Sequence, residues 1–165
     1  MLLLFAGNET TPNLIGNGLL ALLQWPEALE LLRRQPALMR RAIEELLRYD
    51  SPVQGVNRQA SADVVLRGQR VRRGEEIVVL LGSANRDPGR FAEPDRLNIL
   101  RADTGHLGFG HGVHYCLGAT LARLTAGVAL TTLLRRWPEL RTEGPPAWRR
   151  QSLVARGLSV FPVRA

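Results

Sequence analysis

The stretch Phe109-Gly110-His111-Gly112-Val113-His114-Tyr115-Cys116-Leu117-Gly118 holds the only cysteine of the chain, where a glycine-rich loop meets an apolar-periodic segment. Its glycines, together with Gly108, allow tight turns and a close approach of the backbone to a flat, bulky group. Cys116 falls near the first turn of the predicted following helix, where the helix dipole and free N–H groups favour a thiolate. The pattern therefore predicts a metal ligand or a nucleophile.

Length and composition indicate one soluble domain over residues 1–165. The apolar start, residues 1–5, is too short to span a bilayer and lacks the features of a signal peptide. A single cysteine excludes an internal disulfide framework, which agrees with a reducing compartment. We therefore expect a cytoplasmic protein with no membrane partner.

The charge of the chain is strongly positive. The net charge is +7, and all 22 basic residues are arginine. The arginines are scattered, and the sequence contains no basic block interleaved with aromatic residues and no helix-turn-helix or zinc-finger spacing. We therefore expect no nucleic-acid partner; solvated helix faces explain the charge, and a docking surface for an acidic partner is the alternative.

Helical periodicity dominates the first third of the chain. Residues 1–24 predict a helix that Gly7, Asn8 and Pro12 interrupt, so a loop joining two short helices is the alternative. Further helices are predicted from Trp25-Pro26 through Leu32 and over residues 37–49. Glu45 and Arg48 lie on one face of the last helix, a spacing common among surface ion pairs.

The remaining segments predict small β-structures and one long helix. Residues 63–71 read as a β-hairpin, residues 77–81 as a buried strand, and residues 83–106 as irregular. The strongest helix follows Cys116 and ends near Trp137-Pro138, and the tail to Val163 suggests one more hairpin. The predicted fold class is mainly α with small β-sheets (α+β).

Several chemistries are compatible with Cys116. His106, His111 and His114 could join it in a zinc site, but their spacing does not match paired-ligand zinc motifs. A nucleophile with a histidine base and a buried structural cysteine are further alternatives. A thiolate on a haem iron explains the open glycine loop, because a flat macrocycle must lie against the backbone there.

The chain resembles the C-terminal part of a bacterial, soluble cytochrome P450, a haem-thiolate monooxygenase. Residues 109–118 match the family signature F-G-x-G-x-H-x-C-x-G at every fixed position, and Glu45-Leu46-Leu47-Arg48 matches E-x-x-R. Residues 6–11, Ala-Gly-Asn-Glu-Thr-Thr, match the oxygen-activation motif of the family's central helix. Residues 84–88 and 94–96 fit the segment before the haem loop.

The resemblance implies roles for individual residues. Cys116 would be the axial ligand of haem b iron, within a loop that includes Phe109, Gly110 and Gly118. His114 and Arg58 would contact the haem propionates. Glu45 and Arg48 would form a structural ion pair with Arg101, or alternatively with Arg96. The resemblance also implies that Glu9 and Thr10 deliver protons to oxygen, while Ala6 and Gly7 leave room for dioxygen.

The resemblance further implies an activity and partners. The expected reaction inserts one oxygen atom of O2 into a small organic substrate, with electrons from NAD(P)H through a reductase and a ferredoxin-type donor. Family members are usually more than twice as long, and the chain starts within the central helix. A truncated haem-binding chain with weak or no turnover is therefore the alternative.

Overall fold

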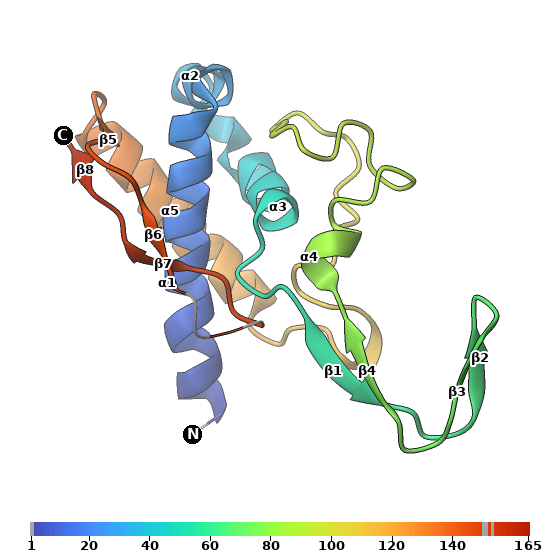
Figure 1. Ribbon diagram of the computed structural model, residues 1–165. Helices are drawn as coiled ribbons and strands as arrows, with labels where there is room; N and C mark the ends of the chain where they lie inside the picture. The colour runs from blue at the N-terminus through green and yellow to red at the C-terminus, as the bar shows by residue number, and fades with distance from the viewer. Residues whose placement is uncertain (1, 150–151, 153) are drawn as a thin grey trace.

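The computed structural model describes the backbone of residues 2–149, 152 and 154–165, and the side chains of these residues from Gly7 onward. Helices form most of the regular structure in this part of the chain (Figure 1). They are α1 (Leu2–Gln24), α2 (Pro26–Arg34), α3 (Met39–Tyr49), α4 (Leu81–Ala84) and α5 (Ala119–Arg136), with 3-10 turns η1 (Pro36–Leu38) and η2 (Gly112–His114). The described residues contain no helix long and apolar enough to cross a membrane.

Helix α1 is continuous through the residues that disfavour a helix, including Pro12. Its buried side chains, among them Leu14, Leu19 and Leu22, pack against α3 and α5. Burial of this face outweighs the weak local propensity, because tertiary packing supplies most helical stability in proteins. The helix prediction is confirmed over residues 2–24, residue 1 lying outside the described residues, and the alternative of two short helices is wrong.

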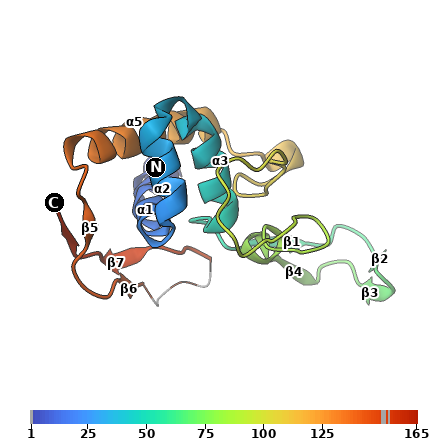
Figure 2. The same ribbon diagram turned by 90° about the horizontal axis from the view of Figure 1, so that it is seen from above.

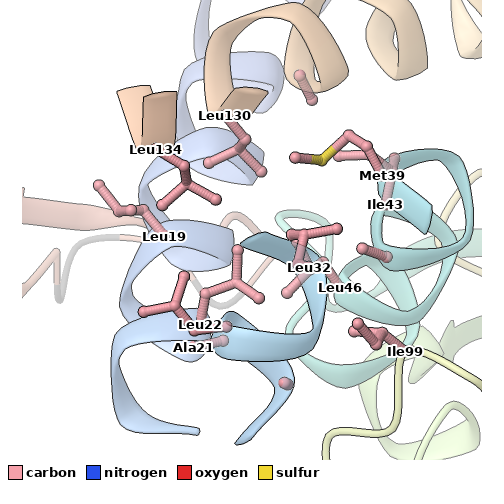
Figure 3. Packing of buried hydrophobic residues seen from close by; sticks show 14 of the residues in the cluster. Leu19, Ala21, Leu22, Leu32, Met39, Ile43, Leu46, Ile99, Leu130 and Leu134 are labelled. Carbon is pink, nitrogen blue, oxygen red and sulfur yellow. The ribbon is translucent and has the colours of Figure 1, made fainter. Parts of the chain in front are cut away.

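The hydrophobic core lies where α1, α2, α3 and α5 meet. Leu22 and Leu32 face Ile43, Leu46 and Leu130 there (Figure 3). All these side chains are at most 2% exposed, so α3 is anchored on one side by close packing. This anchor matters because α3 also carries the charged residues of the candidate site.

The strands form small antiparallel pairs. In the described residues, β1 (Val56–Gln59) pairs with β4 (Glu76–Val79), and β2 (Val64–Leu66) pairs with β3 (Gln69–Val71). Near the C-terminus, β5 (Arg141–Thr142) pairs with β8 (Val163–Arg164), and β6 (Ala147–Trp148) pairs with β7 (Leu158–Val160). The β2–β3 hairpin projects away from the helices in both views, while β5 and β7 contact α1 (Figures 1 and 2). The expected class, mainly α with small sheets, is confirmed.

One prediction for the strands is wrong. The segment 77–81 is not a buried strand, because β4 ends at Val79, Leu81 starts α4, and Val78 is 60% exposed. A short apolar run has the same pattern whether its strand is covered or bare, so periodicity could not decide burial. In the tail, the consecutive strands β6 and β7 pair antiparallel, which agrees with the predicted hairpin, and β8 pairs in addition with the earlier β5.

Candidate functional site

The cysteine loop is closed by backbone hydrogen bonds. The Cys116 N–H donates to the Phe109 carbonyl at 2.9 Å, and the Gly110 N–H donates to the Leu107 carbonyl at 2.8 Å. Gly110 and Gly112 have φ angles of +74° and +71°, in the left-handed region that L side chains rarely adopt. The glycines at these two positions are therefore required by the turn itself.

Cys116 lies just ahead of α5 rather than in its first turn. Gly118 caps this helix, and Cys116 is an exposed, free cysteine. Gly118 has an ordinary φ of −85°, and the nearest side chain that a Cβ there would meet is Cys116, with Sγ at 4.0 Å. The protein itself therefore does not need a glycine at 118, whose missing side chain leaves open space beside the sulfur.

Exposed apolar side chains lie near Cys116 in the sequence and in the loop. Val113 is 98% exposed and Leu117 is 91% exposed. Among the described residues, no group of three or more His, Cys, Asp or Glu side chains could hold a metal ion. The arrangement thus offers a single sulfur ligand beside an apolar surface.

Arg48 is the most extensively bonded buried side chain of the site. Its side chain is 1% exposed, and it donates to both Glu45 carboxylate oxygens at 2.8 and 2.9 Å. The remaining bonds go to the carbonyls of Asn85, Pro94 and Arg96 at 2.9, 2.8 and 3.1 Å. All five N–H donors of the guanidinium are thereby used. A buried charge demands such pairing, which fixes the irregular segment 85–96 against α3.

The structure places Arg101, and not Arg96, on the Glu45 carboxylate. Arg101 Nε lies 3.1 and 3.3 Å from the two oxygens, and the Asn98 N–H donates to Oε1 at 2.8 Å. The guanidinium of Arg96 instead lies 3.6 Å from Glu93 at the surface. Glu45 therefore holds two arginines that are far apart in the sequence.

Asn85 connects this ion-pair network to the cysteine loop. Its carbonyl accepts from Arg48, and its side-chain Oδ1 accepts the Leu107 N–H at 2.7 Å. Asn85 is fully buried, so this bond is shielded from water. Sequence reasoning assigned no role to Asn85 beyond its place in residues 84–88, because spacing does not reveal a contact with residue 107.

Sequence reasoning also missed a second network, built on Glu44. Arg123 Nε and Nη2 donate to its two carboxylate oxygens at 2.6 and 3.0 Å, and His106 Nε2 lies 3.1 Å from Oε2. Burial raises the pKa of Glu44, but hydrogen bonds from His106 and Arg123 outweigh it and lower this pKa from 4.5 to about 2. The only available signal was a second carboxylate beside Glu45.

Arg58 and His114 are both exposed, on β1 and in η2. Within the described residues, the Arg58 guanidinium donates through Nη1 to the adjacent Asn57 carbonyl at 2.8 Å. Neither side chain forms an ion pair with a carboxylate in this part of the chain. Both groups are thus available to an external anion.

The residues expected on the oxygen side all lie on α1. Gly7 is exposed, and a Cβ there would meet nothing within 4 Å. Glu9 pairs with Arg149 at 3.3 Å, and Thr10 follows it as a half-buried residue. The side chain of Ala6 lies outside the described residues. Glu9 and Asn13 line the same cavities as Arg149, between α1 and the C-terminal strands.

Comparison with known proteins identifies the family. The model of the family described as Cytochrome P450 matches residues 1–147. The chain belongs to the cytochrome P450 family. Membership in this family implies a haem cofactor.

Individual P450 relatives agree with this assignment. The chain is 51% identical over 167 residues to "Cytochrome P450 107B1" of Saccharopolyspora erythraea, covering 99% of this chain and 41% of the relative. It is 49% identical to the "Biotin biosynthesis cytochrome P450" of Bacillus subtilis, with coverages of 99% and 41%. The chain therefore spans about 41% of the length of these curated relatives.

Solved P450 structures share the fold. The structure of P450BioI in complex with hexadec-9Z-enoic acid ligated acyl carrier protein superposes with a TM-score of 0.95 at 49% identity, covering 98% of this chain and 42% of that chain. The ligand-free P450 monooxygenase TamI superposes with a TM-score of 0.95 at 42% identity, with coverages of 99% and 41%. The described fold is thus part of the P450 fold.

The buried ion pair yields a stability prediction. Glu45→Gln should lower the free energy of unfolding by about 3–5 kcal/mol, because it leaves the Arg48 charge buried without its counter-ion. Urea denaturation measures the change. The control is Glu30→Gln, which removes the half-exposed carboxylate paired with Arg33 and should cost less than about 1 kcal/mol. Equal small effects of both substitutions would contradict the role of Glu45.

The lowered pKa of Glu44 yields a pH prediction. Because this pKa is about 2 in the fold and 4.5 without these contacts, ionised Glu44 stabilises the fold above about pH 4.5, and this contribution is lost as pH falls toward 2. The difference in free energy of unfolding between wild type and Glu44→Gln should therefore be constant near neutrality and shrink with acidity over that window. A difference independent of pH would refute the assignment.

Proposed function

We propose that the chain supplies the haem-thiolate site of a P450 monooxygenase, with the Cys116 thiolate as the axial ligand of haem b. The observation that carries the proposal is an exposed cysteine in a hydrogen-bonded loop, beside open space that Gly118 leaves unfilled. Residues 1–165 would form one part of the complete P450 domain. Bound haem supplies the iron at which dioxygen is activated, so that one oxygen atom enters a small organic substrate.

The residues around Cys116 fit a flat apolar group. Val113 and Leu117 are almost fully exposed, a costly arrangement for aliphatic side chains that a macrocycle would relieve by covering them. Phe109 holds the cysteine backbone through its carbonyl, and Gly110 turns the chain. The N–H groups of Leu117 and Gly118, which lie ahead of α5, would donate to the thiolate and tune its basicity.

The charged ends of the cofactor also have partners. Haem carries two propionate carboxylates, and the exposed Arg58 and His114 offer a guanidinium and an imidazole for them. Neither side chain is committed to a carboxylate within the described part of the chain. Their exposure supports a role toward a ligand better than a role in the fold.

The oxygen side of the site would use α1. The Glu9 carboxylate and the Thr10 hydroxyl can hold and pass a proton, while Gly7 and Ala6 would leave room for dioxygen. Arg149 lies 3.3 Å from Glu9 and keeps this carboxylate beside the cavity. Proton delivery at this position is the chain's own contribution to the reaction.

A groove between α3 and α5 suits an acidic electron donor. Its lining combines the exposed apolar residues Leu124 and Val128 with four arginines, at positions 40, 41, 123 and 135, and with one carboxylate, Glu44, so its net charge is positive. Opposite charges steer protein association, and the net charge of +7 has the same sign as the groove. We propose that a ferredoxin-type donor, reduced by an NAD(P)H-dependent reductase in the cytoplasm, docks here.

A second candidate is a haem-binding chain without turnover. The exposed Leu121 of α5, which lies outside the groove between α3 and α5, favours it because a complete catalytic domain would cover such an apolar side chain. Both candidates require haem on Cys116. Substrate consumption by the haem-loaded chain with reductase, ferredoxin and NADPH separates them.

Reconstitution with haem tests the proposal. The reduced, carbon monoxide-treated chain should show the red-shifted Soret band of thiolate ligation, and Cys116→Ser should lose it because serine supplies no thiolate. His111→Ala, which changes an exposed loop residue with no assigned role, is the control and should keep the band. Identical spectra of wild type and Cys116→Ser would overturn the proposal.

A further inference from the structure

We propose that Glu44, His106 and Arg123 form a positioning triad that holds both ends of the cysteine loop and thereby orients Cys116. The inference rests on the proposed function, because the triad orients Cys116 for the haem iron that the proposed function places there. It concerns residues outside the sequence motifs of the loop and of the Glu45 network. All three act through other residues, so they are positioning and not catalytic residues.

His106 connects α3 to the beginning of the loop. The Gly108 N–H donates to His106 Nδ1 at 3.0 Å, so this nitrogen carries no proton. The proton of the neutral ring therefore sits on Nε2, which donates to Glu44 Oε2 at 3.1 Å. The ring is 3% exposed, and protonation of Nδ1 would break the bond to Gly108. The Nε2–H tautomer of His106 thus connects Glu44 to Gly108 at a fixed distance.

Gly108 is packed against the His106 ring. A Cβ at position 108 would lie 3.2 Å from both His106 Nδ1 and the Leu47 carbonyl, and 3.3 Å from Ser51 Oγ. Such contacts are tighter than ordinary van der Waals distances, so a side chain at 108 would push the loop away from the C-terminal end of α3. The start of the loop is therefore fixed sterically as well as by hydrogen bonding.

Arg123 holds the part of the loop next to Cys116. Its Nη1 donates to the Tyr115 hydroxyl at 3.2 Å, and its guanidinium carbon lies 4.5 Å from the centre of the Phe109 ring. Tyr115 precedes Cys116, and the Phe109 carbonyl accepts the Cys116 N–H. Glu44 anchors the same guanidinium through two further bonds. Arg123 therefore connects Tyr115 and Phe109, which both contact Cys116, to α3.

The two adjacent carboxylates of α3 thus serve different parts of the loop. Glu45 reaches Leu107 through Arg48 and Asn85, whereas Glu44 reaches Gly108 and Tyr115 through His106 and Arg123. Cys116 itself is exposed, so the orientation of its sulfur depends on these flanking contacts. Loss of the triad should therefore loosen the loop selectively.

Hydrogen exchange in the haem-free chain tests this inference. In Glu44→Gln, the amide N–H groups of Gly108 and Cys116 should exchange about tenfold faster, the effect of losing roughly one hydrogen bond's net contribution. Amides of the helical core, such as Leu46 and Leu130, should change less. Glu143→Gln, which removes a half-exposed carboxylate paired with Arg164, is the control and should leave the loop amides unchanged.

Two further measurements keep the test decisive if Glu44→Gln fails to fold: a milder variant, and a nitrogen-15 NMR spectrum of the wild type. Tyr115→Phe removes only the hydroxyl that Arg123 contacts and should accelerate exchange at Cys116 more than at Gly108. Nitrogen-15 NMR of wild type should show His106 as the Nε2–H tautomer. Unchanged exchange in both variants, equal acceleration at all amides, or the Nδ1–H tautomer would each overturn the triad.

The haem-loaded chain separates this inference from the proposed function. The thiolate-type carbon monoxide band of Glu44→Gln should convert to a non-thiolate form faster than that of wild type, while Glu143→Gln should match wild type. Absence of the band in wild type would refute haem-thiolate ligation and leave the exchange result intact. A band equally stable in Glu44→Gln and wild type would refute the orienting role of the triad alone.

Discussion

The buried guanidinium of Arg48 is the constraint on which the candidate site depends. A charge removed from water must find partners for every N–H group, and here those partners come from α3 itself and from the carbonyls of Asn85, Pro94 and Arg96. A segment with no helix or strand of its own is thereby held against a packed helix. The ion pair fixes geometry, and the hydrophobic core around α3 provides the stability that this arrangement requires.

Helix α3 has a double role because its faces differ. Ile43 and Leu46 belong to the core, while Glu44 and Glu45 leave the helix about 100° apart and reach separate sets of partners. The two carboxylates bind three arginines and one histidine between them. Every one of these partners lies in, or bonds to, the segments that precede, form or follow the cysteine loop. A short helix thus transmits the rigidity of the core to an exposed cysteine.

The features that could be predicted from the sequence are those determined by residues close together in the chain. The loop at 109–118, the helix after it and the helix over residues 37–49 depend on neighbours in the chain, so motif and periodicity were sufficient. Helix α1 was predicted although Pro12 disfavours it, since the apolar spacing reports the packing that outweighs propensity. The burial of residues 77–81 was predicted wrongly, because an apolar run does not say whether anything covers it. Glu44 contacts His106, 62 positions away in the chain, and Arg123, 79 positions away. No rule based on sequence spacing predicts contacts over such separations.

In the proposed site, helix α3 holds the cysteine loop in its haem-binding conformation before haem binds. A crystal structure of the reconstituted chain, with anomalous scattering measured at the iron edge, tests this arrangement most directly. We expect an iron peak bonded to Cys116 Sγ, with the Gly108 N–H still donating to His106 Nδ1 and Arg123 still bonded to Tyr115 and Glu44. An iron peak on His111 or His114, or a loop rebuilt around the cofactor with these bonds lost, would contradict it.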